Sequence, residues 1–266
     1  MKDDSGSRNK LSELLAKWPK GAVATATWLE QQGVSPDLAK KYPRSGWMRR
    51  IERGAYGRLD DAVDWTGALF AVQEQLKLPV HLGAKRALEE QGYGHFVRQR
   101  EGGRLPLYSP RGTRLPSWFS RHDWGVQLAF KAADLFPGKM ELGLTKRTFG
   151  DLSIRLSAPE RAMLEALNEV PKFQSFEEAR LLMGGLATLR PELVQELLES
   201  CRSVKAKRLF LFLADEADHP WVKELSVSKV DLGKGKRSIV KGGRLDQKYQ
   251  ITVEPNPEAV SLHEGP

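Results

Sequence analysis

Apolar residues recur at helical spacing near the start of the chain. They follow an i, i+3, i+4, i+7 pattern, which places them on one face of an amphipathic helix that the segment Pro19-Lys20-Gly21 ends. These residues are Leu11, Leu14, Leu15 and Trp18. A short second helix is expected to begin after Thr25 or Thr27 and to end at Gly33.

The third helix has the most clearly marked start in the chain. Ser35 can cap its exposed amides, Pro36 loses no hydrogen bond at the first helical position, and Asp37 complements the positive end of the helix dipole. The helical period then predicts one packing face and one opposite, largely cationic face. The packing face holds Leu38, Ala39 and Tyr42, and the opposite face holds Asp37, Lys40 and Arg44.

Pro43 affects where this third helix ends. Its ring clashes with the carbonyl four residues back, and it disfavours helical geometry at Tyr42. We therefore expect the helix to end or kink before Arg44, so Lys40 is the cation that the helix most securely holds on its outward face.

Residues 47–56 predict a two-stranded hairpin with Arg53-Gly54 at its tip. Only Gly33, Val34 and Ser35 separate the second helix from the third, which is typical of a helix-turn-helix. A helix-turn-helix followed by a short hairpin is the order of a winged helix-turn-helix. In that arrangement the last helix enters the major groove of DNA, and the wing can reach backbone phosphates.

Cations are concentrated where such docking needs them. Residues 40–58 contain seven Lys or Arg against the single acid Glu52, in a chain whose net charge is +8. The residues that we expect to contact DNA are Ser35, Lys40, Lys41, Arg44, Arg49, Arg50 and Arg53. One alternative stays open, namely a small helical module whose charges are merely solvated. We expect the aromatic residues of this module to form its core rather than to stack on bases, and these are Trp18, Trp28, Trp47 and Tyr56.

The remaining sequence predicts a larger domain of mixed secondary structure. A helix is expected over residues 84–91, strand-like segments fall at 107–109, 126–130 and 152–156, and closing strands are expected at 239–240 and 249–253. Helices dominate after residue 157, with starts marked by Ser157 and Glu160, by Ser175 and Glu178, and by Pro191. We therefore predict an α+β protein. It has a winged helix-turn-helix domain over residues 1–58, a larger mixed α/β C-terminal domain over residues 59–254, and a loose tail over residues 255–266.

A second cationic segment lies at residues 229–248, where seven Lys or Arg face only Asp231 and Asp246. The segment Gly233-Lys234-Gly235-Lys236 lacks the rest of a nucleotide-binding Walker pattern, so it predicts a basic loop. The candidates for a second basic surface are Lys234, Lys236, Arg237, Lys241 and Arg244.

The sequence offers no motif for catalysis, for a metal or for a cofactor. The five histidines are scattered, the acidic pairs lie in helical contexts where they diverge, and the single cysteine, Cys201, is expected to be a partly buried thiol. No apolar run approaches the roughly 20 residues that span a bilayer, and the first residues are polar. We expect a cytoplasmic protein that is not an enzyme and that has no catalytic residues, metal, cofactor or membrane partner.

The chain resembles the AbiEi family of bacterial type IV antitoxins, in the branch of transcriptional regulators with a distinct N-terminal domain. The resemblance covers most of residues 7–253 and begins with residues 11–21 and 28–35. The segment 46–56, which reads Gly-Trp-Met-Arg-Arg-Ile-Glu-Arg-Gly-Ala-Tyr, is its more characteristic part. Residues 157–162 and 233–237 also resemble the family, whereas Pro43 departs from its pattern.

This resemblance implies an antitoxin that represses its own operon by binding inverted repeats in double-stranded DNA through the winged domain. The C-terminal domain would counteract a cognate nucleotidyltransferase-like toxin without requiring a stable complex. Two other hypotheses remain: a metal-dependent nuclease whose carboxylates meet only in the fold, and a protein-interaction module whose basic segment binds the toxin directly.

Overall fold

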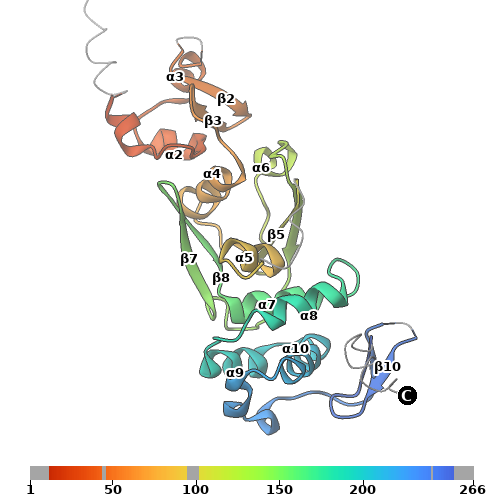
Figure 1. Cartoon of the computed structure of the whole chain (residues 1–266). Coiled ribbons are helices and arrows are strands. Elements are labelled where there is room, and N and C mark those ends of the chain that lie inside the picture. Colours follow the sequence, from red (N-terminus) through yellow and green to blue (C-terminus); the bar gives the residue numbers. More distant parts are fainter. Residues whose placement is uncertain (1–11, 44–45, 95–101, 241, 255–266) are drawn as a thin grey trace, which may run out of the picture. The chain divides into compact units, whose positions relative to one another are not determined.

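Figure 1 shows a computed structural model of the chain, which describes residues 12–43, 46–94, 102–240 and 242–254. The chain divides into two compact units, each made of several segments. The first unit holds residues 1–81, 101–132 and 146–156, and the second holds residues 82–100, 133–145 and 157–266. This division by compactness differs from the expected domain boundary after residue 58, which stays a prediction. The expected tail, residues 255–266, lies outside the described residues.

The first unit begins with a helical segment over residues 12–17. Its further elements, in chain order, are β1 (Ala24–Thr25), α2 (Ala26–Gln31), α3 (Pro36–Lys41), β2 (Met48–Glu52), β3 (Ala55–Arg58), α4 (Trp65–Phe70), the π-helical segment η1 (Ala71–Gln75), β4 (His81–Leu82), β5 (Arg104–Ser109), α6 (Ser117–Arg121), β6 (Gln127–Ala132), β7 (Leu144–Phe149) and β8 (Leu152–Ser157). Three of these strands, β4, β7 and β8, extend by one or two residues into the second unit.

The two short helices near the N-terminus start at side-chain caps. The Thr25 hydroxyl accepts a hydrogen bond of 3.1 Å from the Trp28 amide, so the second helix begins after Thr25 rather than after Thr27. The Ser35 hydroxyl accepts one of 3.3 Å from the Leu38 amide at the start of α3. Helix α3 ends at Lys41, just before Pro43, as the sequence predicts.

The expected hairpin is confirmed, with β2 antiparallel to β3 and a turn at Arg53-Gly54. Gly54 has a φ of 87°, a left-handed conformation that glycine adopts without steric cost. A third strand, the two-residue β1, pairs with β3 and gives the order β1-β3-β2. The sequence does not predict β1, because two residues are too short to show an alternating pattern.

A compact core holds these elements together. Trp18 is 1% exposed, and its ring meets the ring of Trp28 edge-on at a centroid distance of 6.0 Å. The prediction that Trp47 also lies in this core is wrong, because its side chain is 46% exposed. Strand alternation explains the difference, since Met48 points into the core and its neighbour must then point outward. The buried members of the core cluster include Leu14, Trp18, Leu29, Val34, Ala39, Tyr42, Met48 and Tyr56.

Helix α4 approaches the N-terminal elements closely. The Val23 amide donates to the Gly67 carbonyl at 3.2 Å, and the Gln75 side chain bonds to the Thr25 amide at 2.9 Å and to the Val23 carbonyl at 2.7 Å. A β-carbon added at Gly67 would lie 1.8 Å from the Gly21 carbonyl oxygen. Only glycine fits at this position of α4.

We expect Gly67→Ala to destabilise the protein by about 3 kcal/mol, because the clash is with backbone that cannot move aside cheaply. Gly184 is the matched control, since it also lies in a helix and an added β-carbon there meets nothing within 4 Å. Gly184→Ala should be neutral or stabilising by about 0.5 kcal/mol. Denaturant unfolding of the two variants measures both values, and an equal response at the two positions would contradict the close approach.

A five-stranded sheet, most of whose residues belong to the first unit, has the order β6-β5-β4-β8-β7. Strands β5 and β6 are parallel neighbours over their whole length. The buried Gln73 side chain donates to the carbonyls of Val80 and Arg155 at 2.9 Å each and accepts from the Arg155 amide at 2.8 Å. Strand β7 lies at one edge of this sheet and was not predicted, since its polar and cationic residues hide the alternation.

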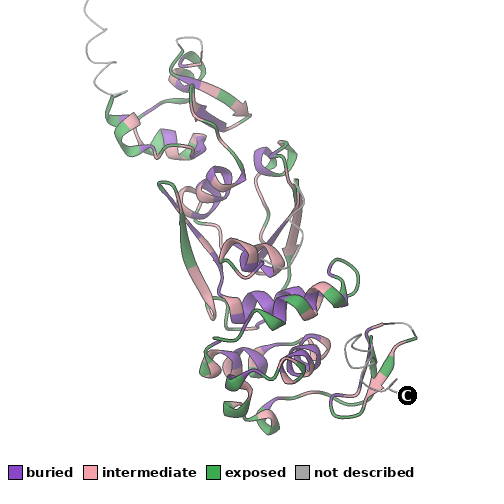
Figure 2. Cartoon of the chain, viewed as in Figure 1, coloured by how far each residue is buried: buried purple, intermediate pink, exposed green. Residues whose placement is uncertain are grey.

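The second unit is mainly helical, and α7 contacts α5, α8, α9 and α10. Figure 2 shows α7 buried along most of its length, in keeping with its central place. The elements of this unit are α5 (Ala84–Glu90), α7 (Pro159–Glu169), α8 (Phe176–Gly184), α9 (Pro191–Ser200), α10 (Val204–Glu216), the 3-10 segments η2 (Pro220–Glu224) and η3 (Val227–Lys229), and the strands β9 (Arg237–Ser238), β10 (Arg244–Asp246) and β11 (Ile251–Val253).

One of the two serine caps expected in this unit is confirmed and the other is wrong. The Ser175 hydroxyl accepts from the Glu178 amide at 3.0 Å, as predicted. Helix α7 instead begins after Ala158, without a side-chain cap. The Ser157 hydroxyl donates to the Glu165 carboxylate at 2.8 Å, so it is committed to a buried group rather than to the helix end.

The closing strands also differ from the expectation. Residues 239–240 lie just after β9 rather than in a strand, and residues 249–250 precede β11. Strand β11 pairs with β9 in parallel and with β10 antiparallel. The expected strands are therefore shifted or shortened by about two residues, and β10 was not predicted.

Candidate nucleic-acid interface

The outward face of α3 is open and carries the expected charges. Ala39 and Tyr42 are buried, whereas Asp37 and Lys40 are exposed, so the predicted division into two faces is correct. Figure 2 shows exposed residues along this helix. Lys40 Nζ lies 3.2 Å from the Asp37 carboxylate, with the two side chains 72% and 86% exposed. Such a surface pair contributes little to stability, so Lys40 can exchange Asp37 for a phosphate at small cost.

The wing presents two further cations. Arg50 and Arg53 are exposed, on β2 and at the turn that follows it. Among the described residues, Arg50 makes one hydrogen bond, which is long at 3.4 Å, to the Glu52 carbonyl. Arg49 differs, because it is half-buried and donates to the Asp61 carbonyl at 3.3 Å. Arg49 therefore helps to hold β2 of the wing to the segment around Asp61.

The remaining predicted residues have more restricted roles. Lys41 is exposed at the end of α3, and Ser35 is exposed with its hydroxyl engaged as the helix cap. Arg44 lies outside the described residues. The members of the predicted set that are exposed on α3 and the wing are thus Lys40, Lys41, Arg50 and Arg53.

Trp47 is a candidate that the sequence interpretation missed. In the sequence it lies immediately before β2, between α3 and the cations of the wing, and its side chain is exposed. The strand pattern could have identified it, because an outward Trp47 follows from an inward Met48. Exposed aromatic rings are among the side chains that stack on bases in nucleic-acid interfaces.

Residues 232–237 of the second cationic segment form a loop that contacts a buried arginine and ends at the first residue of β9. Arg208 of α10 is 3% exposed and donates to four backbone carbonyls at 2.6 to 3.1 Å. These carbonyls belong to Leu232, Gly233, Gly235 and Gln250. Four such bonds hold the backbone of the loop to the helix.

The cationic side chains of this loop face solvent, and so does Arg244 at the start of β10. Exposed cations of the predicted second surface are Lys234, Lys236, Arg237 and Arg244, while Lys241 lies outside the described residues. Lys248 differs from them because it pairs with the Asp215 carboxylate, and Tyr249 donates to that carboxylate at 2.6 Å. The exposed cations of the loop are therefore carried on a backbone that Arg208 holds in place.

Cys201 is buried, as expected, with 2% of its surface exposed. Burial raises the pKa of its thiol to about 11. The fraction of reactive thiolate at pH 8 is then roughly two hundred times lower than that of an ordinary thiol of pKa 8.5. We expect negligible labelling by a thiol reagent at pH 8 in the native protein and one equivalent of labelling after denaturation; rapid native labelling would show that the thiol is accessible.

Among residues 12–43, 46–94, 102–240 and 242–254, no group of three or more His, Cys, Asp or Glu side chains is placed to hold a metal ion. Within the same ranges, no helix is long and apolar enough to cross a membrane.

A short helix pair with a cationic second helix, followed by a cationic hairpin, is the arrangement of winged helix-turn-helix transcriptional regulators. Two family profiles agree with this class. The profile described as "Transcriptional regulator, AbiEi antitoxin N-terminal domain" matches residues 7–99, and the one described as "Transcriptional regulator, AbiEi antitoxin, Type IV TA system" matches residues 103–254. The chain belongs to this family of AbiEi antitoxins, which are transcriptional regulators of type IV toxin–antitoxin systems.

Among solved structures, the fold is similar to that of the RV2827C protein from Mycobacterium tuberculosis, with a TM-score of 0.61. The two sequences are 20% identical, and the similarity covers 91% of this chain and 88% of the other. At this identity the likeness concerns the fold alone. No curated protein matches the chain.

Proposed function

We propose that this protein represses its own operon by binding inverted repeats in double-stranded DNA through α3 and the wing. In the same system it acts as the antitoxin of a nucleotidyltransferase-like toxin. The observation that carries the first part is the exposure of Lys40, Arg50 and Arg53 on neighbouring elements, free of buried ion pairs. The family supports both parts, since its members are regulators and antitoxins.

In the proposed complex, the residues divide between two tasks. Helix α3 enters the major groove, where Lys40 reaches a base edge or an adjacent phosphate and Ser35 lies near the backbone. Arg50 and Arg53 of the wing neutralise phosphates beside the groove. Lys41 adds positive charge at the end of the helix, and Arg49 mainly positions the wing. Arg44, which lies outside the described residues, stays a candidate contact on the sequence alone.

Binding of the full-length protein to the DNA upstream of its own gene tests the repressor function. In a competition gel-shift at 0.15 M salt, we expect this DNA to bind about a thousandfold or more tightly than an unrelated duplex of equal length. Mutating one arm of an inverted repeat in that DNA should remove most of the preference. Equal affinity for the two duplexes would contradict sequence-specific repression.

For the antitoxin function, we propose that the loop of the second unit contributes through its exposed cations. Replacing Lys234, Lys236 and Arg237 together by Ala should leave the loop backbone in place, because Arg208 binds only its carbonyls. Co-expression with the toxin encoded beside this gene provides the measurement. We expect the triple variant to lose rescue of growth while operator binding is retained, and full rescue would exclude a role for these cations.

A direct complex with the toxin is a second candidate, favoured by the same exposed cations, which suit an acidic partner surface. Co-purification of the two proteins at low and high salt distinguishes it from neutralisation without a complex. A salt-sensitive complex that the triple variant fails to form would support direct binding. No observation in the described residues favours the nuclease hypothesis.

A further inference from the structure

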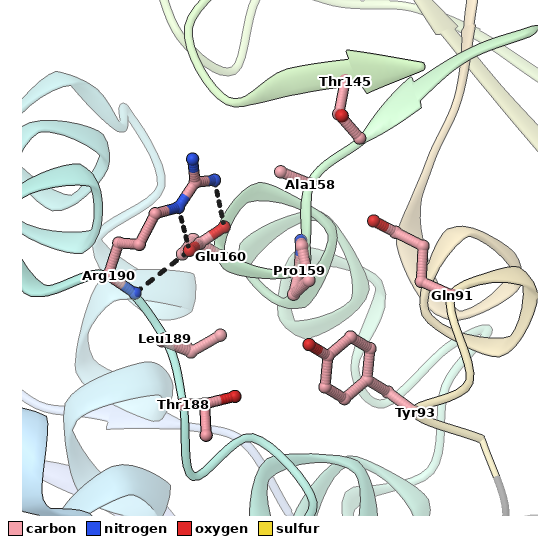
Figure 3. A pocket seen from close by; sticks show the side chains of 9 residues that line it. All are labelled: Gln91, Tyr93, Thr145, Ala158, Pro159, Glu160, Thr188, Leu189 and Arg190. Carbon is pink, nitrogen blue, oxygen red and sulfur yellow. Dashed lines mark hydrogen bonds and ion pairs between the residues drawn. The ribbon is translucent and has the colours of Figure 1, made fainter. Parts of the chain in front are cut away.

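The second unit contains an open pocket of about 490 Å³ that the DNA-binding function does not use. Its size falls in the range of small-molecule sites. Figure 3 shows side chains from the segment just after α5, from the start of β7, from the start of α7 and from the segment before α9 around this pocket. The lining residues are Gln91, Tyr93, Thr145, Ala158, Pro159, Glu160, Thr188, Leu189 and Arg190.

Arg190 is held at the edge of the pocket by a buried carboxylate. Its Nε and Nη2 donate to the two oxygens of Glu160 at 2.9 and 3.1 Å, and its backbone amide donates to the same carboxylate at 3.1 Å. Glu160 is 3% exposed, whereas the Arg190 side chain is 62% exposed. Burial alone would raise the pKa of Glu160, but the hydrogen bonds from Arg190 hold it below its ordinary value. The carboxylate therefore stays ionised and fixes the guanidinium in one orientation.

Several donors around the pocket have no internal partner. Within the part of the chain that the structure describes, Nη1 of Arg190 and the hydroxyls of Tyr93, Thr145 and Thr188 make no hydrogen bond. Figure 3 shows these groups on different sides of the pocket. Donors on several sides of one pocket suit a tetrahedral oxyanion, which has three oxygens to satisfy, better than a planar carboxylate.

Gln91 adds an acceptor to this set. Its Nε2 donates to the carbonyls of Ala87 and Ser157 at 2.7 and 2.9 Å, so the amide is held with its oxygen facing away from those groups. In Figure 3 this oxygen points toward the pocket. An inorganic phosphate would leave both the acceptor and most of the volume unused, whereas an organic phosphate with a hydroxyl group would use them.

We propose that this pocket binds a small organic phosphate, with the phosphate at Arg190 and the surrounding hydroxyls and with a hydroxyl of the organic part donating to Gln91. The protein would thus carry a small-molecule site in addition to its DNA-binding surface. The proposal is independent of the operator and toxin functions.

Calorimetric titration of the full-length protein with adenosine 5′-monophosphate, ribose 5-phosphate, inorganic phosphate, and the unphosphorylated adenosine and ribose tests the proposal. We expect at least one of the two phosphate esters to bind at least tenfold more tightly than its unphosphorylated counterpart and than inorganic phosphate. No detectable binding of either ester at 10 mM, or equal binding with and without the phosphate, would overturn it.

Variants that keep the shape of the pocket locate the binding. Tyr93→Phe, Thr145→Val and Thr188→Val each remove one hydroxyl, and each should weaken the binding of the ester about three- to tenfold. Thr148→Val is the matched control, because Thr148 is exposed on the same strand as Thr145 and outside the pocket. Ester binding that none of the three variants weakens would place the ligand elsewhere and overturn the assignment. Thermal unfolding of the same samples serves as a check that the variants fold.

Discussion

Replacing Arg50 and Arg53 together by Ala should lower the affinity of the full-length protein for its operator roughly 30- to 100-fold at 0.1 M salt. The reason is that each lost phosphate contact gives up the release of about one counterion from the DNA. The slope of log affinity against log salt should therefore fall in magnitude by about 1.8. Fluorescence anisotropy with labelled operator, at four or more salt concentrations, measures both quantities.

A charge-matched variant separates these contacts from a general effect of net charge. Arg111 and Arg114 are also exposed and make no hydrogen bond or ion pair within the described residues, so Arg111→Ala with Arg114→Ala removes the same charge elsewhere. This control should change the affinity less than threefold. If both double variants lost the same affinity, the wing would have no special part in binding.

Replacing Glu165 by Ala should destabilise the protein by about 3 to 5 kcal/mol, because it leaves a buried arginine without its partner. Glu165 is 1% exposed and accepts from Arg161 Nε at 2.9 Å, from the Ser157 hydroxyl at 2.8 Å and from the Ala84 amide at 3.0 Å. Arg161 also donates to the carbonyls of Met140 and Leu142 at 2.7 Å each. The carboxylate thus connects α7 to the start of α5 and, through Arg161, to the segment before β7.

Thermal or urea unfolding gives the free energy of unfolding for this variant. Glu141→Ala is a suitable control, since Glu141 is exposed and makes no side-chain hydrogen bond or ion pair within the described residues. It should change the stability by less than about 0.5 kcal/mol. A small effect at Glu165 would mean that water or a rearranged side chain replaces the carboxylate and that the network is not needed for stability.

The N-terminal elements could be predicted because their signals are local. Thr25 and Ser35 cap helices a few residues away, Pro43 acts on the helix that precedes it, and Gly54 serves the turn in which it lies. Each of these effects depends on neighbours in sequence. The order of helices and wing strands, and the exposed cations on them, could therefore be predicted without knowing the fold.

The errors concern residues for which a general tendency, such as a cap spacing or the usual burial of aromatic side chains, is overridden in the folded unit. Ser157 has the spacing of a cap, but Glu165 in the folded unit offers its hydroxyl a buried charged partner. Trp47 was placed in the core because large aromatic side chains are usually buried, although the register of β2 turns it outward. The requirement for glycine at Gly67 depends on the Gly21 carbonyl, which no local pattern reveals.

The pocket of the second unit could not be predicted for the same reason. Its lining comes from four segments that include Gln91, Thr145, Glu160 and Arg190, and the sequence marks none of them as part of a site. The second cationic segment shows the intermediate case. Its charge could be predicted, but the role of the buried Arg208 in fixing the loop could not, because a buried arginine in a helix resembles an exposed one in sequence.

Site-directed DNA cleavage from α3 tests the central claim most directly. Because Cys201 is buried, Lys40→Cys provides one reactive thiol on the exposed face of the helix, to which an iron chelate can be attached. If α3 lies in the major groove, the labelled full-length protein should cut the operator at positions centred within the two inverted-repeat arms. Absence of cutting there, or the same cuts from a chelate at Arg111→Cys, would show that α3 does not bind the operator.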